Sequence, residues 1–330
     1  MVKFLIVRFS SIGDIVLTSP VARHLKQQVE GAEVHYLTKA AYAPLLEANP
    51  HIDKVHRLED KLSNCLSSLQ EEGFDYIIDL HHNLRSARVK FKLKRIDFSV
   101  NKLNWKKWLL VRLKINRLPD LHMAERNLET IRSFIDKKDG KGLEYFIPEQ
   151  EEVDLSTLPA AFQSAYIALS IGAQHATKKL PPEALVQLCS KLEEPVLILG
   201  GKEDREIGEQ IIASLPDRDI LNCCGLYSIH GSASLVRQSS VLITHDTGLM
   251  HVGAAFEKKI VSIWGNTHPA FGMSPWKAHP DSRIFEVQDL KCRPCSKIGY
   301  AACPKKHFRC MRDQDLDEIA RVSQHLFSGT

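Results

Sequence analysis

The chain has 330 residues, 44% of them hydrophobic and 25% charged, and a net charge of +4; this is ordinary globular composition, and the length suits two α/β lobes better than one core. It holds no low-complexity tract, which argues against long disorder, and no run of about 18 apolar residues, the length of a transmembrane helix. The apolar run 4–7 is too short for a signal peptide, so we expect a cytoplasmic protein unless it adheres to a membrane face.

The first half of the sequence alternates short apolar runs with stretches of helix length. Residues 4–7 indicate a buried strand, the turn 10–14 ends it, and residues 15–28 can form a helix that kinks or breaks near Ser19, because Pro20 falls inside it. Further strands are expected at 34–37, 55–58, 76–80 and 96–100. Such alternation predicts a mostly parallel sheet with right-handed crossovers.

The second half starts the same alternation again. Strands are expected at 166–171, 196–199, 220–222, 241–244 and 260–264, with helices such as 182–192 and 205–214 between them. The acidic, proline-bearing stretch 148–159 is the natural linker, so we expect an N-terminal lobe over 1–155 and a C-terminal lobe over 156–330. We expect the last helix, 313–327, to pack back on the N-terminal lobe.

Two doubly wound, Rossmann-like α/β lobes that face a central cleft are the simplest architecture for this pattern. Ligands of such sheets bind beyond the carboxyl ends of the strands. We therefore look for functional residues in the turns that follow each strand, and we expect the two lobes to share one site.

Basic charge concentrates in one segment. Residues 88–117 hold eleven Lys and Arg against one acid, Asp97, so the remainder of the chain is acidic. Trp105 and Trp108 lie among these cations, a combination that suits an anionic membrane surface. Nucleic acid is the competing partner, but no nucleic-acid-binding motif accompanies the segment. A solvated surface helix is the other alternative.

The strongest local signal is a buried strand that runs into Asp246-Thr247-Gly248 and then into a helix of small residues. Asp246 or Thr247 can cap that helix, and Gly248 lets a ligand approach the backbone. The N–H groups and the dipole of the helix would then favour a phosphate. The alternative is an ordinary capped turn, which any α/β protein contains.

The corresponding turn of the first lobe contains Ser11, Gly13 and Asp14. It has no Walker lysine and no GxGxxG pattern, which argues against a P-loop enzyme and against a dinucleotide-dependent oxidoreductase. Asp14 falls in the first turn of a helix, where any carboxylate is favourable. Helix capping is therefore the alternative to a chemical role.

Two other turns of the second lobe carry polar residues. A lysine of Lys178-Lys179-Leu180-Pro181 could reach a diphosphate, or it could lie in a solvated loop. Glu203 could accept hydrogen bonds from ribose hydroxyls, or it could simply begin the next helix.

The eight cysteines form two groups. Four are scattered among apolar stretches, where free thiols usually act as small hydrophobic side chains; these are Cys65, Cys189, Cys223 and Cys224. The other four lie near the C-terminus with His307 and are of the types that bind zinc; these are Cys292, Cys295, Cys303 and Cys310. Their spacing is not that of a common zinc finger, so free thiols, or disulfides after oxidation, are the alternatives.

In combination, these motifs resemble the bacterial lipopolysaccharide heptosyltransferases of glycosyltransferase family 9, which have the GT-B fold. The resemblance covers nearly the whole chain and rests on residues 6–16, 178–181, 246–251 and 265–267, which occur in the order of the family. Each segment is weak alone, but their combination is specific, and it favours phosphate binding at Thr247 and Gly248.

The resemblance implies an inverting transfer of heptose from ADP-heptose to the lipid A–Kdo or inner-core acceptor of lipopolysaccharide, with no cofactor or metal required. Asp14 would be the general base for the acceptor hydroxyl. Lys178 or Lys179, with the N–H groups near Thr247 and Gly248, would stabilise the departing nucleoside diphosphate. Another nucleotide-sugar donor is the alternative, and a non-catalytic binder of lipid or nucleic acid is the rival class.

The resemblance also implies two sets of binding residues. Glu203 would hold the ribose and Tyr227 would lie near the base. The donor set is Lys179, Gly201, Glu203, Tyr227, Asp246, Thr247, Gly248 and His251. The acceptor set, whose cations would bind phosphorylated sugars, is Ser11, Gly13, His81, Arg85 and Arg88. The implied partners are the nucleotide sugar, an anionic glycolipid and the inner face of the cytoplasmic membrane, with no nucleic acid.

Overall fold

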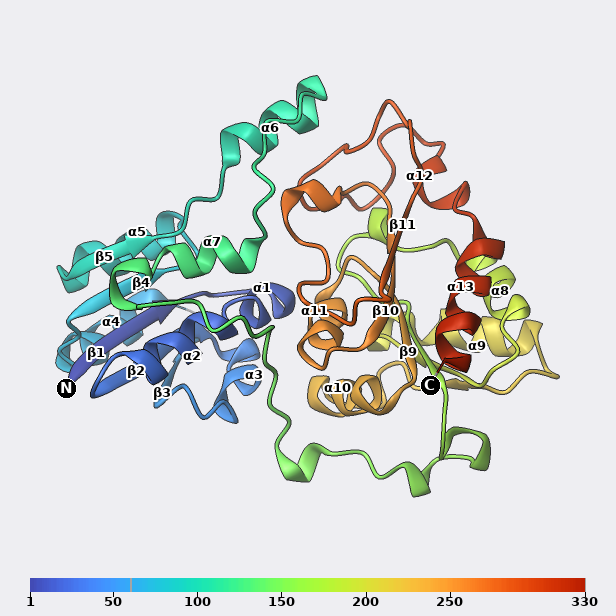
Figure 1. Cartoon of the computed structure of the whole chain (residues 1–330), viewed down its shortest axis with the longest axis horizontal. Coiled ribbons are helices and arrows are strands. Elements are labelled where there is room, and N and C mark those ends of the chain that lie inside the picture. The colour runs from blue at the N-terminus through green and yellow to red at the C-terminus, as the bar shows by residue number, and fades with distance from the viewer. Residues whose placement is uncertain (60, 330) are drawn as a thin grey trace. The chain divides into compact units, whose positions relative to one another are not determined.

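The computed structural model describes residues 1–59 and 61–329 and divides them into two compact units (Figure 1). The first unit comprises Met1–Leu103 and Leu121–Phe146, and the second comprises Asn104–Asp120 and the chain from Ile147 onward. The boundary therefore falls before the expected position at 155. The segment Asn104–Asp120 groups with the second unit, where Lys114 Nζ donates hydrogen bonds to the carbonyl groups of Cys292 and Pro294 in the cysteine-bearing segment 292–310.

The first unit is built on a five-stranded parallel sheet in the order β3-β2-β1-β4-β5. Its strands are β1 (Val2–Val7), β2 (Ala32–Lys39), β3 (Lys54–Leu58), β4 (Tyr76–Asp79) and β5 (Ile96–Ser99). Its helices are α1 (Ile12–Val16), α2 (Ser19–Gln28), α3 (Pro44–Glu47), α4 (Leu62–Glu71), α5 (Leu84–Leu93) and α7 (Met123–Glu129). The expected break near Ser19 is confirmed, since Pro20 falls in the first turn of α2, where proline is tolerated.

The second unit is built on a six-stranded parallel sheet in the order β11-β10-β9-β6-β7-β8. Its strands are β6 (Ile167–Ser170), β7 (Val196–Leu199), β8 (Ile220–Asn222), β9 (Val241–His245), β10 (Lys259–Trp264) and β11 (Arg283–Glu286). Its helices are α6 (Asn104–Leu113), α8 (Pro182–Lys191), α9 (Arg205–Ser214), α10 (Ile229–Gln238), α11 (Gly248–Ala255), α12 (Arg309–Arg312) and α13 (Leu316–Ser328).

Each strand expected from the sequence is present, and the sheets are parallel as predicted. β6 and β7 are fully buried and apolar except for Ser170, the pattern of strands whose two faces are both covered by helices. β11 was not expected. It is an edge strand that pairs only with β10 among the described strands, and half of its short sequence is exposed, so it lacks the apolar run that identifies the others.

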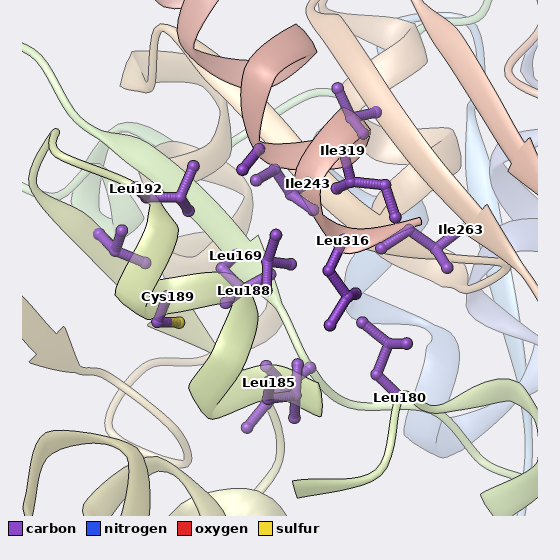
Figure 2. Close-up of a cluster of buried hydrophobic side chains, with 14 of the residues drawn as sticks. Leu169, Leu180, Leu185, Leu188, Cys189, Leu192, Ile243, Ile263, Leu316 and Ile319 are labelled. Carbon is purple, nitrogen blue, oxygen red and sulfur yellow. The ribbon is translucent and has the colours of Figure 1, made fainter. Parts of the chain in front are cut away.

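The last helix, α13, packs in the core of the second unit. Its apolar residues recur at helical spacing and enter the core of the second unit. Leu316 and Ile319 pack there with Leu185 and Leu188 of α8 (Figure 2). These contacts account for the buried face of the helix within its own unit, and the expectation that it packs back on the N-terminal lobe stays a prediction.

Candidate functional site

The candidate residues of the second unit all follow carboxyl ends of its strands. Because these strands are parallel, the turns after them lie at one edge of the sheet. The turns after β6, β7, β8, β9 and β10 carry, in that order, Lys178, Glu203, Tyr227, Thr247 and Asn266. The topology therefore gathers at one edge residues that are widely separated in sequence.

Lys178 lies beside the start of α11. Its Nζ is 2.6 Å from Asp246 Oδ2, and it also donates to the Asp246 carbonyl oxygen at 3.1 Å. Thr267 Oγ1 donates to the same carboxylate oxygen at 2.9 Å. Asp246 is buried, so its carboxylate orients the lysine ammonium next to Thr247, the residue before the helix.

The start of α11 fits an anion. Thr247 occupies the N-cap position with extended backbone, and Gly248 begins the helix; both are partly exposed. Within the described residues, the Thr247 side chain makes no capping hydrogen bond, and Asp246 is engaged by Lys178 and Thr267. The first N–H groups of an α-helix lack partners within the helix, and its dipole favours negative charge there. The Lys178 ammonium and the start of α11 thus lie together, where both favour a bound anion.

Lys179 contacts a different carboxylate. Its Nζ is 2.5 Å from Asp204 Oδ1, and the other oxygen of Asp204 accepts a hydrogen bond from Gly201 N at 2.9 Å. Asp204 is 1% exposed. A Cβ at Gly172 would lie 2.6 Å from Asp204 Oδ2, so the close approach depends on glycine. The two lysines are therefore distinct: Lys178 lies at the helix start, and Lys179 pairs with a buried carboxylate from another turn.

The other donor-side candidates lie in turns at the same edge of the sheet and in α11. Glu203 is exposed, and its carboxylate folds over Gly201, where a Cβ would collide with it. Tyr227 is half-buried against Gly231, and burial raises the pKa of its hydroxyl. His251 is buried in α11, one turn beyond Gly248.

Asn266 is a site candidate that the sequence reasoning did not select. Its side chain is 1% exposed, and neither polar atom of its amide has a hydrogen-bond partner among the described residues. Leaving such a group unpaired costs about 1–3 kcal/mol, which suggests a place for a ligand. The signal was present, since residues 265–267 are one of the segments on which the family resemblance rests.

In the first unit, Asp14 is held by an arginine. Arg8 Nη2 lies 2.7 Å from Asp14 Oδ2, and Ser11 Oγ donates to the same oxygen at 3.0 Å. Arg8 is anchored in turn by hydrogen bonds to the carbonyl groups of Ser10 and Leu80. Ser11 N also approaches Asp14 Oδ2 at 3.4 Å, so the carboxylate takes part in capping α1. It remains 26% exposed, which leaves it accessible to a substrate.

Arg8 was missed as a site residue, although it directly follows the buried strand β1. A charged residue at the carboxyl end of a parallel strand is the signal that could have identified it. The structure places its guanidinium between the main chain and Asp14, where it fixes the orientation of the carboxylate.

Two of the acceptor-side candidates, His81 and Arg85, contact Phe9. His81 Nδ1 accepts a hydrogen bond from Phe9 N at 3.4 Å, and the Arg85 guanidinium lies 5.6 Å from the Phe9 ring centroid. Burial, reinforced by the charge of Arg8, lowers the pKa of His81 to about 4, so its imidazole is neutral at pH 7. Arg88 lies one turn further along α5 and is exposed, and Gly13 is buried inside α1.

The four C-terminal cysteines all carry free thiols. Cys292 Sγ lies 3.7 Å from His307 Nε2. Among the described residues, the only three metal-binding side chains whose ligand atoms lie within 4.8 Å of one another are in the first unit. The four thiols are therefore not gathered into one ligand shell, and zinc at this position stays a prediction.

The cysteine-bearing segment nevertheless contacts the turns of the candidate site. Thr177 N donates to Tyr300 O at 3.2 Å, and Tyr300 N donates to Thr177 Oγ1 at 2.8 Å. Cys295 N donates to Asn266 O at 3.1 Å. A cavity of about 390 Å³ lies between these parts and is bordered by Thr177, Cys303 and neighbouring residues. This segment thus positions the turns that carry Lys178 and Asn266.

The basic segment 88–117 spans part of α5, β5 and the partly exposed helix α6, which carries its two tryptophans. The rings of Trp105 and Trp108 stack with centroids 5.0 Å apart, and 66% and 43% of these residues are exposed. Lys114 ties the end of the helix to the carbonyl groups of Cys292 and Pro294. None of the helices described, α6 included, has both the length and the apolar character needed to cross a membrane.

The chain resembles known proteins over its whole length. The model of glycosyltransferase family 9 (heptosyltransferase) matches residues 64–304. The lipooligosaccharide heptosyltransferase 2 of Campylobacter jejuni is 24% identical over 97% of this chain and 96% of its own. The lipopolysaccharide heptosyltransferase 1 of Pseudomonas aeruginosa is 23% identical over 95% of this chain and 93% of its own.

A solved structure shares the fold. The ADP-heptose lipopolysaccharide heptosyltransferase II of Escherichia coli superposes with a TM-score of 0.74 at 20% identity and covers 99% of both chains. The α/β fold expected from the sequence, with two doubly wound parallel sheets, is therefore the GT-B fold of the heptosyltransferases. On the family match and this architecture together, the chain belongs to glycosyltransferase family 9, the heptosyltransferases, and is a glycosyltransferase.

Proposed function

We propose that this protein transfers heptose from ADP-heptose to the lipid A–Kdo or inner-core acceptor of lipopolysaccharide, with inversion at the anomeric carbon and with no metal required. The observation that carries the proposal is the position of Lys178 beside the start of α11. Membership of the family supports the reaction class. The E. coli relative, whose name specifies an ADP-heptose donor, supports this choice of donor.

The departing ADP needs its growing negative charge stabilised. Lys178 Nζ and the N–H groups at Thr247 and Gly248 are preorganised to receive phosphate oxygens, which is the most effective form of electrostatic catalysis. A diphosphate would compete with Asp246 for the ammonium, so Asp246 holds Lys178 in position until the donor arrives. In this proposal the lysine and the helix start do the work that a divalent ion does in metal-dependent transferases.

Asp14 acts as the general base. Its carboxylate accepts the proton of the acceptor hydroxyl as that oxygen forms its bond to the anomeric carbon. The bond from this carbon to the ADP oxygen breaks with its electron pair, and ADP leaves on the opposite face. Arg8 positions the carboxylate through Oδ2. Because Asp14 and Lys178 belong to different units, the proposal requires both units to contribute to one reaction.

The acceptor is an anionic glycolipid, and the surface features of the chain suit it. Arg85 and Arg88 offer guanidinium groups for phosphorylated sugars. The stacked tryptophans of the cationic helix α6 suit the headgroup region of an anionic membrane. We therefore place the protein at the inner face of the cytoplasmic membrane, bound peripherally.

Turnover of ADP-heptose with a Kdo-bearing lipid A acceptor tests the proposal. Asp14→Asn keeps a side chain that can cap α1 but removes the base, and we expect kcat to fall by about 10²- to 10⁴-fold. Asp136→Asn is the matched control, because Asp136 is an exposed acid of the same unit. If Asp14→Asn kept near-normal kcat, Asp14 would not be the base. If ADP-heptose were not consumed by the unaltered protein while another nucleotide sugar was, the donor would be wrong.

A further inference from the structure

A second group of chemically active side chains lies in the first unit, at the middle of its strands. His35 is in β2, His56 is in β3, and Glu72 directly follows α4. The register pairs His35 with Lys54 and Leu37 with His56, so the two histidines point to the same face of the sheet. This position differs from that of Asp14, which follows the carboxyl end of β1. The mechanism proposed above uses none of the three residues.

The three side chains bring their ligand atoms close together. His35 Nδ1 lies 3.0 Å from His56 Nε2, and these atoms lie 3.9 Å and 4.0 Å from the Glu72 oxygens. A tetrahedral zinc ion with nitrogen and oxygen ligands at ordinary bond lengths separates its ligand atoms by roughly 3.3 Å. Shifts of a few tenths of an ångström would therefore convert the observed cluster into three corners of such a shell.

The surroundings prepare the histidines for this role. Glu33 Oε1 lies 2.7 Å from His35 Nε2, so a carboxylate fixes the tautomer and directs the Nδ1 lone pair into the cluster, as carboxylates do behind metal-bound histidines. The side chains of His35, His56 and Glu72 are 1%, 9% and 16% exposed.

We propose that His35 Nδ1, His56 Nε2 and a Glu72 carboxylate oxygen form a binding site for a divalent transition metal, with zinc as the ion that fits best. Two imidazoles and one carboxylate are ligands that zinc accepts, and water would complete the shell. The ion would join β2, the edge strand β3 and the segment that leads into β4. Its role is structural, because the site lies away from the strand ends that carry Asp14.

Two lysines compete with the ion for this site. Lys54 forms an ion pair with Glu72, and Lys3 Nζ lies 3.6 Å from Glu72 and 3.1 Å from Glu33. The Lys54 side chain is 55% exposed, so its ammonium can move into water when a metal takes the carboxylate. Removing the Lys54 charge should therefore strengthen metal binding. If His35, His56 and Glu72 form only an ion-pair network, removing this charge should weaken the network and should not strengthen metal binding.

Zinc binding to the full chain, stripped of metal by a chelator, tests the proposal by calorimetry and thermal shift. Cys292→Ser and Cys295→Ser are introduced together in every sample to remove thiol ligands. We expect one zinc ion per chain and a raised Tm. Glu33→Gln should weaken binding by about 10- to 100-fold, the usual effect of losing the carboxylate behind a ligating histidine. Lys54→Met should tighten binding several-fold.

His56→Gln removes a ligand and should abolish binding, and His279→Gln is its control, because His279 faces Asp281 on the surface of the second unit. Cobalt(II) in place of zinc should give the visible absorption of a four-coordinate site in the protein that keeps His35, His56 and Glu72, and not in the His56→Gln variant. Equal zinc affinity in the His56→Gln variant would overturn the proposal, and so would unchanged or weaker binding by Lys54→Met. The Lys54 variant keeps the test decisive if His56→Gln does not fold.

Discussion

Each of the two sheets has an ion pair just beyond the carboxyl ends of its strands, and the two pairs differ in which charge is the more buried. In the second unit a carboxylate, Asp246, holds a lysine, and in the first unit a guanidinium, Arg8, holds a carboxylate. In each pair the more exposed side chain is the one to which the proposal assigns chemistry: Lys178 is 18% exposed against 9% for Asp246, and Asp14 is 26% exposed against 9% for Arg8. The buried partner orients and the exposed partner reacts.

The comparison extends to the residues behind each pair. His245 precedes Asp246, and His81 follows β4 near Arg8; burial lowers the pKa of each histidine to about 4. Each pair therefore has a neutral imidazole near it that adds no charge of its own. The two edges use the same construction with the signs reversed, as expected where one side must receive a proton and the other must receive a phosphate.

Substitutions of Lys179 and of Lys178 should differ most in their effect on the free energy of unfolding. Lys179→Met leaves Asp204 buried without its cation, so we expect the free energy of unfolding to fall by about 3 kcal/mol. Lys178→Met should cost about 1 kcal/mol or less, because the Asp246 side chain is 9% exposed and can be hydrated, whereas that of Asp204 is 1% exposed; each carboxylate keeps one other hydrogen bond. Urea denaturation measures both. Equal losses in the two variants would remove the distinction between a structural and a functional lysine.

The pH dependence of stability tests the buried histidine of the second unit. Unfolded His245 has an ordinary pKa of 6.5, whereas the folded value is about 4, so the unfolded state binds more protons between these values. Stability is complete above pH 6.5 and falls as the pH drops toward 4. His245 alone should cost about 2 kcal/mol between pH 7 and pH 5. Denaturation of His245→Gln at both pH values should show a smaller difference, and an unchanged difference would contradict this assignment.

Substitution of Arg8 tests the ion pair of the first unit, with a smaller expected effect. Arg8→Met removes the group that orients Asp14, and we expect kcat to fall about tenfold, which corresponds to about 1.4 kcal/mol, with KM little changed. Arg8→Lys should recover part of the loss, because it restores the charge without the second anchoring hydrogen bond. If KM rose while kcat stayed constant, Arg8 would bind the acceptor instead of positioning the base.

The tryptophan pair should give the smallest effect. Replacing Trp105 and Trp108 by Ser removes the exposed apolar surface of α6 and leaves its cations in place. Binding to vesicles that contain anionic lipid should weaken several-fold, and binding to neutral vesicles should be weak for both proteins. If the unaltered protein and the double variant bound anionic vesicles equally well and with the same salt dependence, charge alone would account for the attachment, and the tryptophan rings would not contribute.

The fold could be predicted from the sequence because its parallel strands are short apolar runs with clear turns between them, as at β7 and β9. β11 escaped prediction because half of it is exposed. The packing of α13 against α8 was not predicted either, because an apolar helix face shows that a helix is packed but does not show against what. The core made by Leu316 and Ile319 decides that question only in three dimensions.

The candidate site was predictable in its turns but not in its pairings. The sequence placed Lys178 and Lys179 in one turn, but only the structure shows that Asp246 holds the first and Asp204 the second. Spacing along the chain carries no information on which carboxylate from another strand lies opposite. For the same reason Arg8 was overlooked, since its role depends on the direction in which it leaves β1.

The affinity for ADP of the Lys178→Met variant tests the central claim most directly, with Lys191→Met, an ion-paired lysine outside the site, as the control. The account predicts that Lys178→Met weakens ADP binding at least tenfold, about 1.4 kcal/mol, while the control binds as the unaltered protein does. Unchanged affinity in a folded Lys178→Met protein would contradict the assignment of this lysine and the start of α11 to the donor diphosphate.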